Sequence, residues 1–543
     1  MKLLRLLFRE SSLSPWFVLF IASLSGLSNS LLLTVINMAT QQPARDSQLF
    51  YIILFIVVLS SYLLFQRYLL ILTINEIERI LHRVRLRIVK KIKNAELLPL
   101  EQLGRSLIYA SVTKEMQTIS SASIGMVMLA QSGLLIIFTL VYIGFLSLVA
   151  LTLFIVFFSV GTLFYLLKMA QFSGQIHESL AFENDLFEAL THVLDGFKEV
   201  KMSERRSADL VEHIDAISTA VKDVKANAMV AVSVASSFAG SAFYVLAGIV
   251  VFILPRIGEY YSRISTDLAT SVLFLAGPLG YLVGSVQIFG TANAAAENLE
   301  DLEAALDKHV RPASKRKARR LAVRRQPFVD IVFDRVQFEY RSIDRQVNFR
   351  LGPIDLSISQ GETIFITGGN GSGKSTFLRL LTCLYFPTKG VVKLDGRRLS
   401  EANAATYREL FSVIFYDYHL FDRLYGLRDI DPEYVEQLLE MLKLKGVTRL
   451  VRSRFEPLDL SSGQKRRLAL LVSYLENKPI NVFDEWAAEQ DPEFRRYFYT
   501  SILPQLKANG KTIIAVTHDD QYHNMGYIDR LIKFTEGRIA SDA

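Results

Sequence analysis

Six long apolar runs in the first half of the chain constrain its fold more than any other feature. A transmembrane helix needs about 20 mostly apolar residues to cross the ~30 Å hydrocarbon core of a bilayer. The composition agrees with such helices, because 50% of the 543 residues are hydrophobic and only 21% are charged. We therefore expect a polytopic α-helical membrane domain in a lipid bilayer, with six transmembrane helices at 15–38, 50–72, 124–145, 147–167, 230–254 and 268–288.

The spacing of the runs predicts how the membrane domain is oriented. Short loops join the runs in pairs, whereas 75–120 and 168–227 are long helix-forming stretches rich in charged residues. Lys and Arg concentrate before the first run and after the second, while the loops on the other side hold only Arg45, Arg256 and Arg263. Since cytoplasmic loops carry an excess of Lys and Arg, both termini and both long stretches are expected in the cytoplasm.

A basic segment separates this half from one of different character. After residue 328 the chain reads as short β-branched strands, glycine turns and amphipathic helices. We expect a membrane domain at 1–310, a basic linker at 311–327 and an α/β domain at 328–543. The net charge is +7, and eight of the basic residues lie at 311–325 without an acid, so the remainder carries 7 − 8 = −1. A nucleic-acid partner is therefore not expected, and we interpret the linker as a solvated juxtamembrane segment, with binding to anionic lipid headgroups as the alternative.

A glycine-rich loop between a strand-like run, 362–367, and a helical run, 377–384, predicts a phosphate-binding site. Glycines let successive backbone N–H groups face the phosphates, and the helix N-terminus adds partial positive charge. We expect Lys374 to reach the β and γ phosphates and Ser375 to ligate Mg²⁺. The loop residues expected to bind nucleotide are Gly368, Gly369, Asn370, Gly371, Ser372, Gly373, Lys374, Ser375 and Thr376. The second half is thus expected to be an α/β P-loop NTPase domain.

Two adjacent carboxylates follow the apolar run 479–483. An aspartate at a strand end can hold the Mg²⁺ shell, and the next carboxylate can polarise a water in line with the γ phosphate. We therefore predict that Asp484 is a metal ligand together with Ser375, and that Glu485 is catalytic. The single cysteine, Cys383, excludes an internal disulfide framework and a zinc site of clustered thiolates.

Two further turns are suited to phosphate. Residues 460–464 read Leu-Ser-Ser-Gly-Gln before a basic helix, and we expect Ser461, Ser462, Gly463 and Gln464 to contact nucleotide. By itself this turn is more typical of a helix cap. His518 follows the β-rich run 511–516 and is placed to contact the γ phosphate, although an isolated histidine is more often structural.

In this order, the phosphate loop, the Ser-Ser-Gly-Gln turn, Asp484-Glu485 and His518 resemble the nucleotide-binding domain of ATP-binding-cassette transporters. Six preceding spans with long intracellular extensions resemble an exporter-type half-transporter. The resemblance implies an ATPase that uses ATP and Mg²⁺, with 460–464 contacting ATP held by the opposite subunit. It also implies that Glu485 is the catalytic base, that His518 is the switch histidine, and that Tyr340 stacks on adenine. For Tyr340 the alternative is an ordinary strand aromatic.

The stretches 483–496 and 411–422 resemble, more narrowly, the bacterial cyclic-peptide and siderophore exporter subfamily. This implies ATP-driven efflux of a cyclic peptide, siderophore or related peptide product across the bacterial inner membrane, by alternating access of a homodimer with cytoplasmic nucleotide-binding domains. The alternatives are a lipid or multidrug exporter, a siderophore importer or processing subunit, and an ATP-gated channel or sensor.

The chain departs from the family where a glutamine normally links the metal site to the membrane domain, because Tyr416 takes that place and Asp417 is the candidate substitute. Segments 96–105 and 194–201 are the candidates for coupling the two domains. Polar residues within the apolar runs are candidates to line a cargo cavity, since polar groups avoid lipid: Asn29, Gln131, Tyr142, Tyr244, Tyr281 and Gln287.

Overall fold

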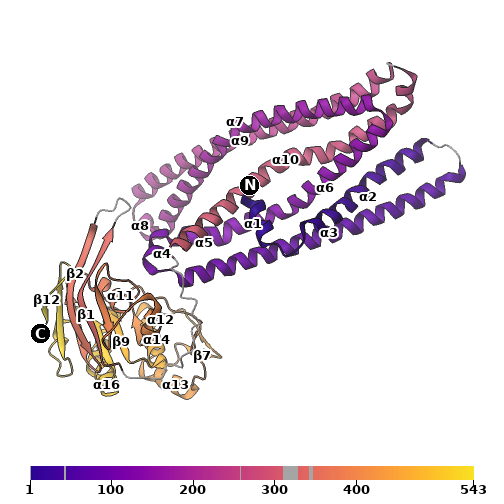
Figure 1. The fold of residues 1–543 in the computed structure, drawn as a ribbon. Coiled ribbons are helices and arrows are strands. Elements are labelled where there is room, and N and C mark those ends of the chain that lie inside the picture. The colour runs from indigo at the N-terminus through magenta and orange to yellow at the C-terminus, as the bar shows by residue number, and fades with distance from the viewer. Residues whose placement is uncertain (1, 42–44, 257, 310–327, 342–346, 543) are drawn as a thin grey trace. The chain divides into compact units, whose positions relative to one another are not determined.

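The computed structural model describes residues 2–41, 45–256, 258–309, 328–341 and 347–542 (Figure 1). The predicted linker at 311–327 lies outside these residues. The chain divides into two compact units. The first comprises Met1–Lys93 and Leu103–Asp307, and the second comprises Asn94–Gln102 and Lys308–Ala543. The short segment Asn94–Gln102 therefore packs with the second unit although it follows the second apolar run.

The first unit consists of long helices that pack along their lengths (Figure 1). Its helices are α1 (Lys2–Glu10), α2 (Pro15–Gln41), α3 (Arg45–Asn94), α5 (Arg105–Ala110), α6 (Met116–Leu146), α7 (Leu148–Asp195), α8 (Phe197–Met202), α9 (Glu204–Gly248) and α10 (Glu259–His309). The short helix α4 (Leu97–Leu103) lies where the chain passes between the two units.

Four helices of the described residues are long and apolar enough to cross a membrane, and they correspond to predicted runs one, two, three and six. They are Trp16–Ala39, Leu49–Asn94, Leu107–Leu146 and Glu259–Lys308. Shorter apolar helices, Leu148–Gly161 and Phe243–Arg256, fall in runs four and five. The expectation of a helical membrane domain with several apolar helices is thus confirmed.

The first helix, α1, joins the distant helices α3 and α10. It buries Leu3 and Leu6, and the Lys2 ammonium lies 2.8 Å from the Glu300 carboxylate on α10. At the other end of α1, Glu10 pairs at 2.7 Å with Arg87 on α3. Arg87 in turn pairs at 2.8 Å with Glu303 on α10. One guanidinium therefore neutralises two carboxylates whose side chains are each only 13% exposed.

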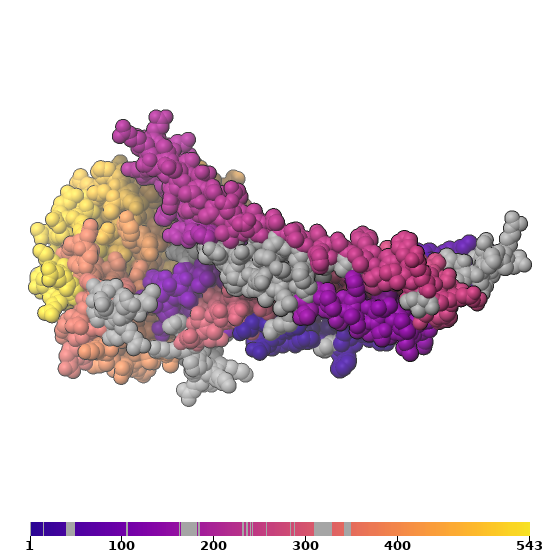
Figure 2. Space-filling view, turned by 90° about the horizontal axis from the view of Figure 1, so that it is seen from above, coloured from indigo at the N-terminus to yellow at the C-terminus, as the bar shows by residue number. Residues whose placement is uncertain are grey.

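The second unit contains a six-stranded sheet in the order β12-β11-β3-β10-β9-β6. All its neighbouring strands are parallel except β11 and β12. The strands are β3 (Thr363–Gly368), β6 (Phe411–Ile414), β9 (Ile480–Asp484), β10 (Thr512–Val516), β11 (Arg530–Thr535) and β12 (Arg538–Asp542). The edge strand β12 is visible at the surface, in yellow, in Figure 2.

An antiparallel sheet in the order β2-β1-β4-β5 packs beside it through a shared core. Its strands are β1 (Asp330–Arg341), β2 (Val347–Ser359), β4 (Lys389–Leu394) and β5 (Arg397–Arg398). The remaining elements include α11 (Lys374–Leu381), α12 (Glu401–Arg408), α13 (Pro432–Met441), β7 (Arg449–Val451), β8 (Arg454–Glu456), α14 (Ser462–Glu476), α15 (Pro492–Tyr497) and α16 (Leu503–Ala508).

The central strands explain where the polar residues gather. Every residue of β9 and β10 is buried, as a parallel sheet covered on both faces requires. Polar side chains for chemistry can therefore emerge only beyond the strand ends. Because β3, β10 and β9 are parallel neighbours, their carboxyl ends meet at one edge of the sheet.

We expect Arg87→Met to lower the stability of the first unit by on the order of 1–2 kcal/mol, because Glu10 and Glu303 would lose the cation between them. Thermal unfolding of the detergent-solubilised protein measures the effect. Arg85→Met, at an exposed position on the same helix, is the control. Equal melting temperatures for the two variants would contradict a stabilising role for Arg87.

Candidate nucleotide-binding site

The phosphate loop takes the predicted strand, loop and helix form, from β3 to α11. Gly368 has φ +142°, and a Cβ there would lie 2.3 Å from the Phe534 carbonyl oxygen, so only glycine fits. Gly369, Asn370 and Gly371 are exposed. The first N–H groups of α11 have no partner within the helix and open toward the same space. The loop is therefore a ready acceptor for an anionic group.

Lys374, the first residue of α11, folds back over this loop. Its ammonium donates to the carbonyl oxygens of Gly368, at 2.8 Å, and Gly369, at 3.1 Å. The residue is only 6% exposed. The Ser372 hydroxyl beside it is buried without a hydrogen-bond partner among the described residues. A buried cation and an unsatisfied hydroxyl at the foot of a glycine loop suit a phosphate group.

Asp484 ends β9 and is almost fully buried. Burial raises the pKa of its carboxyl to about 6, although a hydrogen bond from the Tyr416 backbone N–H, at 3.4 Å, works in the opposite direction. No Lys or Arg of the described residues forms an ion pair with it. The Ser375 hydroxyl is exposed on the first turn of α11. A buried carboxylate without a cation and a free hydroxyl fit the oxygen ligands that Mg²⁺ prefers.

Glu485 and His518 lie together beyond two adjacent strands. Val516, the last residue of β10, pairs with Asp484 on β9 and with Ile366 on β3. The Glu485 carboxylate therefore comes within 3.2 Å of His518 Nε2. Glu485 adopts the left-handed conformation, with φ +50°, and its N–H donates to the Val516 carbonyl oxygen. The structure thus brings together the loop, Asp484, Glu485 and His518 as expected.

The turn that carries His518 is anchored by residues on both sides of it. The Tyr499 hydroxyl lies 2.6 Å from the Thr517 hydroxyl and donates to the Asp519 carboxylate at 3.0 Å. Arg495 lies 3.5 Å from the same carboxylate. The imidazole itself remains half exposed. The backbone at His518 is therefore fixed while its ring can reach a ligand.

Arg466, which the sequence did not single out, holds Glu485 from behind. Its side chain is 2% exposed and donates to the Glu485 carbonyl oxygen at 2.6 Å and to the Glu489 carboxylate at 3.1 Å. Its guanidinium lies 5.3 Å from the ring centre of Tyr416. Buried arginine is rare. The three consecutive basic residues Lys465-Arg466-Arg467 do not indicate in the sequence which of their side chains is buried.

The Ser-Ser-Gly-Gln turn forms the N-terminus of α14. Ser461 caps the helix, and its backbone N–H donates in return to the side-chain oxygen of Gln464 at 2.9 Å. The cap uses the side-chain oxygen of Gln464, and contact of this turn with nucleotide stays a prediction. The Gly463 carbonyl oxygen accepts from Gln490 at 3.1 Å. In the described chain no hydrogen bond joins this turn to the phosphate loop.

Tyr340 on β1 belongs to an aromatic cluster. Its ring centre lies 5.1 Å from Phe338, 6.0 Å from Tyr385 and 6.3 Å from Phe349. Phe349, its strand partner, reaches closer to the loop, since its ring lies 3.2 Å from where a Cβ of Gly373 would stand. Adenine stacking by Tyr340 stays a prediction.

Asp417, the candidate substitute at the glutamine position, lies beside Arg379 of α11, with 3.8 Å between charged atoms. Arg379 also contacts the Glu101 carboxylate at 3.6 Å, and the Tyr385 hydroxyl donates to Glu101 at 2.5 Å. Glu101 belongs to the segment Asn94–Gln102, which packs with this unit. A chain of charges therefore leads from the neighbourhood of Asp484 to one of the predicted coupling segments.

We expect Arg466→Met to lower stability by on the order of 3 kcal/mol, since it removes a buried cation that bonds the Glu485 carbonyl oxygen and Glu489. ATP hydrolysis should fall with it, because Glu485 would lose its backbone anchor. Thermal unfolding and hydrolysis rates measure both effects. Lys465→Met, at the exposed neighbouring position, should behave like the wild type; a similar loss in that variant would contradict a specific role for Arg466.

Comparison with known proteins agrees with this geometry. Residues 351–488 match the family described as "ABC transporter". The chain is 30% identical to ATP-binding protein SyrD of Pseudomonas syringae pv. syringae, over 99% of this chain and 96% of that protein. It is also 31% identical, over 35% of this chain and 31% of the relative, to the probable syringafactin export ATP-binding/permease protein SyfD of Pseudomonas syringae pv. syringae strain B728a.

Among solved structures, a bacterial Atm1-family ABC exporter with ATP bound has the same fold. The TM-score is 0.75 at 17% sequence identity, and the match covers 97% of this chain and 93% of the other. The match includes both the helical unit and the unit that holds the phosphate loop. The chain therefore belongs to the ABC transporter family, as an exporter-type half-transporter of the inner membrane that couples ATP hydrolysis to transport.

Proposed function

We propose that two copies of this chain form a homodimer that exports a peptide product, with each ATP held between the phosphate loop of one copy and the Ser-Ser-Gly-Gln turn of the other. One observation carries the proposal. Within one chain the loop, Asp484, Glu485 and His518 meet at one sheet edge. The α14 N-terminus instead bonds to the segment 485–491 that follows β9. Among the described residues no hydrogen bond joins the two phosphate-binding elements within one chain, which supports their completion by a second chain.

The residues at the sheet edge divide the chemistry of hydrolysis among them. The loop from Gly368 to Thr376 would hold the phosphates, and Tyr340 would stack on adenine. Ser375 and Asp484 would hold Mg²⁺, which supplies charge that neutralises the β and γ phosphate oxygens. Glu485 would orient the attacking water and accept its proton. His518, 3.2 Å from that carboxylate, would keep it oriented and contact the γ phosphate.

A peptide cargo is supported by two sequence observations. The stretch 483–496 resembles the exporters of cyclic peptides and siderophores, and the relative SyfD is named for syringafactin export. ATP-dependent uptake of cyclic peptides into inside-out vesicles tests the cargo class. Uptake of lipids or unrelated drugs, with none of any peptide in a panel, would overturn it.

Glu485→Gln should keep ATP binding but lower steady-state hydrolysis at least 100-fold, because the amide cannot accept the proton of the attacking water. Nucleotide binding and phosphate release, measured on the same reconstituted sample, separate the two effects. Glu493→Gln makes the same change at an exposed carboxylate of the neighbouring helix and should leave the rate within about twofold. Hydrolysis by Glu485→Gln near the wild-type rate would reject Glu485 as the base.

The shared site is tested by mixing two inactive variants. Lys374→Ala removes the cation at the phosphate loop. Ser462→Asp places a negative charge at an exposed helix N-terminus, where it stabilises the helix but repels a phosphate brought by the other copy. Mixed dimers retain one complete site, so a co-expressed mixture should recover about a quarter of the wild-type rate if sites act independently. A mixture as inactive as each variant alone would contradict the shared site.

A further inference from the structure

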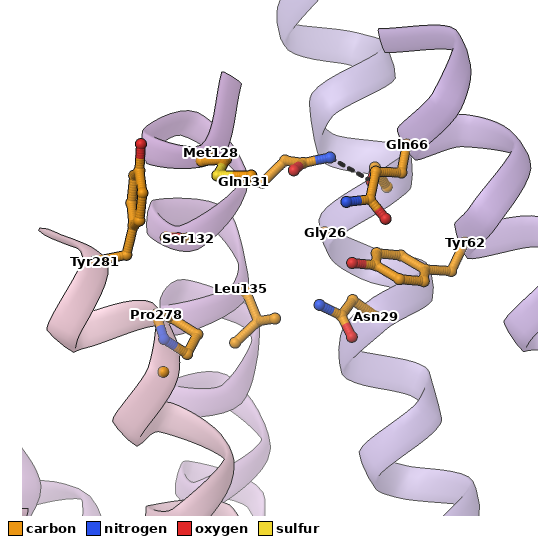
Figure 3. A pocket seen from close by; sticks show the side chains of 12 residues that line it. Gly26, Asn29, Tyr62, Gln66, Met128, Gln131, Ser132, Leu135, Pro278 and Tyr281 are labelled. Carbon is orange, nitrogen blue, oxygen red and sulfur yellow. Dashed lines mark hydrogen bonds between the residues drawn. The ribbon is translucent and has the colours of Figure 1, made fainter. Parts of the chain in front are cut away.

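A cavity of about 240 Å³ lies within the helices of the first unit (Figure 3). It is lined by α2, α3, α6 and α10, which are the four described helices long and apolar enough to cross a membrane. Its lining is nevertheless polar at seven positions: Ser25, Asn29, Tyr62, Gln66, Gln131, Ser132 and Tyr281. Polar side chains at such depth are costly and mark functional sites by default.

Part of this polarity is satisfied by the protein itself. The Gln131 amide donates to the Ser25 hydroxyl at 2.9 Å, and the Tyr281 hydroxyl donates to the Gly125 carbonyl oxygen at 3.1 Å. By contrast, Asn29, Tyr62 and Gln66 form no hydrogen bond with any residue that the structure describes. Figure 3 shows these three side chains directed into the cavity from α2 and α3.

The same helix shows that the fold can satisfy a polar residue elsewhere along its length. Asn37, two turns beyond Asn29 on α2, is 2% exposed, donates to the Tyr142 hydroxyl at 3.2 Å and accepts from Thr270 at 2.9 Å. Of the other sequence candidates for a cargo cavity, Tyr244 is 73% exposed and the side chain of Gln287 lies outside the described residues. The open amides and hydroxyl around the cavity are thus a distinct feature of this site.

The lining selects by charge. It contains no Asp, Glu, Lys or Arg, so a charged group would enter without a counter-charge to offset its desolvation. The carboxamides of Asn29 and Gln66 each donate and accept, which is the pattern that pairs with a peptide amide in both directions. Leu135 and Pro278 supply apolar contacts on the opposite side, as Figure 3 shows.

The volume of the cavity suits a fragment of a larger ligand rather than a whole molecule. Cavities that enclose a whole drug-sized ligand have roughly 300–1,000 Å³, and this one is smaller. We infer that the cavity binds an uncharged, amide-bearing segment of the exported molecule, through the open hydrogen-bonding groups of Asn29, Tyr62 and Gln66. The inference rests on the proposed function for the cargo being a peptide.

The test measures binding to the protein in lipid nanodiscs without ATP. The probes are tritium-labelled head-to-tail cyclic hexaalanine and its fully N-methylated analogue, which lacks amide donors. The variant Tyr62→Phe with Gln66→Met keeps side-chain size and removes the polar groups. Tyr244→Phe removes the same hydroxyl from an exposed position outside the cavity and is the matched control.

We expect cyclic hexaalanine to bind the wild type and the Tyr244→Phe control alike, and to bind the double variant at least about tenfold more weakly, as the loss of two hydrogen bonds implies. The N-methylated ring should bind the wild type as weakly as cyclic hexaalanine binds the double variant. Basal ATP hydrolysis should stay within about twofold of the wild type in the Tyr244→Phe control. The inference would be overturned if the wild type and the double variant bound the ring equally, or if the wild type bound the two rings equally. It would also be overturned if the wild type bound neither ring, which is the result expected for a cavity filled only by water.

Uptake into inside-out vesicles separates this inference from the proposed function. ATP-dependent uptake of the ring that persists undiminished in the double variant would overturn the role of the cavity and leave peptide export standing. Binding that is lost in the double variant, with no ATP-dependent uptake by the wild type, would support the cavity and overturn export of this peptide.

Discussion

The parallel pairing of β3, β10 and β9 is the constraint on which the nucleotide site depends. In this register Val516 stands beside both Ile366 and Asp484, so three strands end together and the loops beyond them share one edge. None of the site residues needs to be adjacent in sequence, and the phosphate loop and His518 are in fact separated by most of the domain. A shift of one strand by a single residue would exchange the side chains on its two faces and move its polar end away from the others. Every residue of β9 and β10 is buried, so such a shift would disrupt the packing on both faces of the sheet.

Behind that edge, a second layer of contacts fixes the backbone while leaving the reactive groups free. Arg466 bonds the Glu485 carbonyl oxygen rather than its carboxylate, and Tyr499 bonds the residues on either side of His518 rather than its ring. Both arrangements order the backbone without engaging the Glu485 carboxylate or the His518 ring, which contact each other. Such preorganisation lowers the cost of arranging the groups when nucleotide arrives.

The elements that the sequence predicted are those whose signal is local. Apolar runs predicted several membrane helices, and the glycine loop in its strand and helix context predicted β3 and α11 because both depend on neighbouring residues. The contacts of Arg466 and Arg379 were not predictable in this way, because their partners lie far along the chain and are selected only by packing. The capping role of Gln464 was within reach, since a serine followed three residues later by glutamine is a known helix start. For the cavity, the sequence predicted only individual polar residues within the apolar runs. That several of them line one cavity depends on how each helix is rotated about its axis, which the sequence does not show.

The contacts of α1 also set an order of events during synthesis. The backbone N–H of Lys2 donates to the side chain of Asn293, 291 positions later, and the Lys2 ammonium pairs with Glu300 on the same helix, α10. The helix α1 is made before α10 and can therefore reach its final place only after α10 has been made. Until α10 has been made, the apolar face of α1 can bind at the membrane surface, as amphipathic helices do. The closing of the helical unit then depends on a long-range contact of the kind that folds slowly. A chain that ended before α10 would keep the contact of Glu10 with Arg87 on α3 but lose the contacts of Lys2 with Asn293 and Glu300.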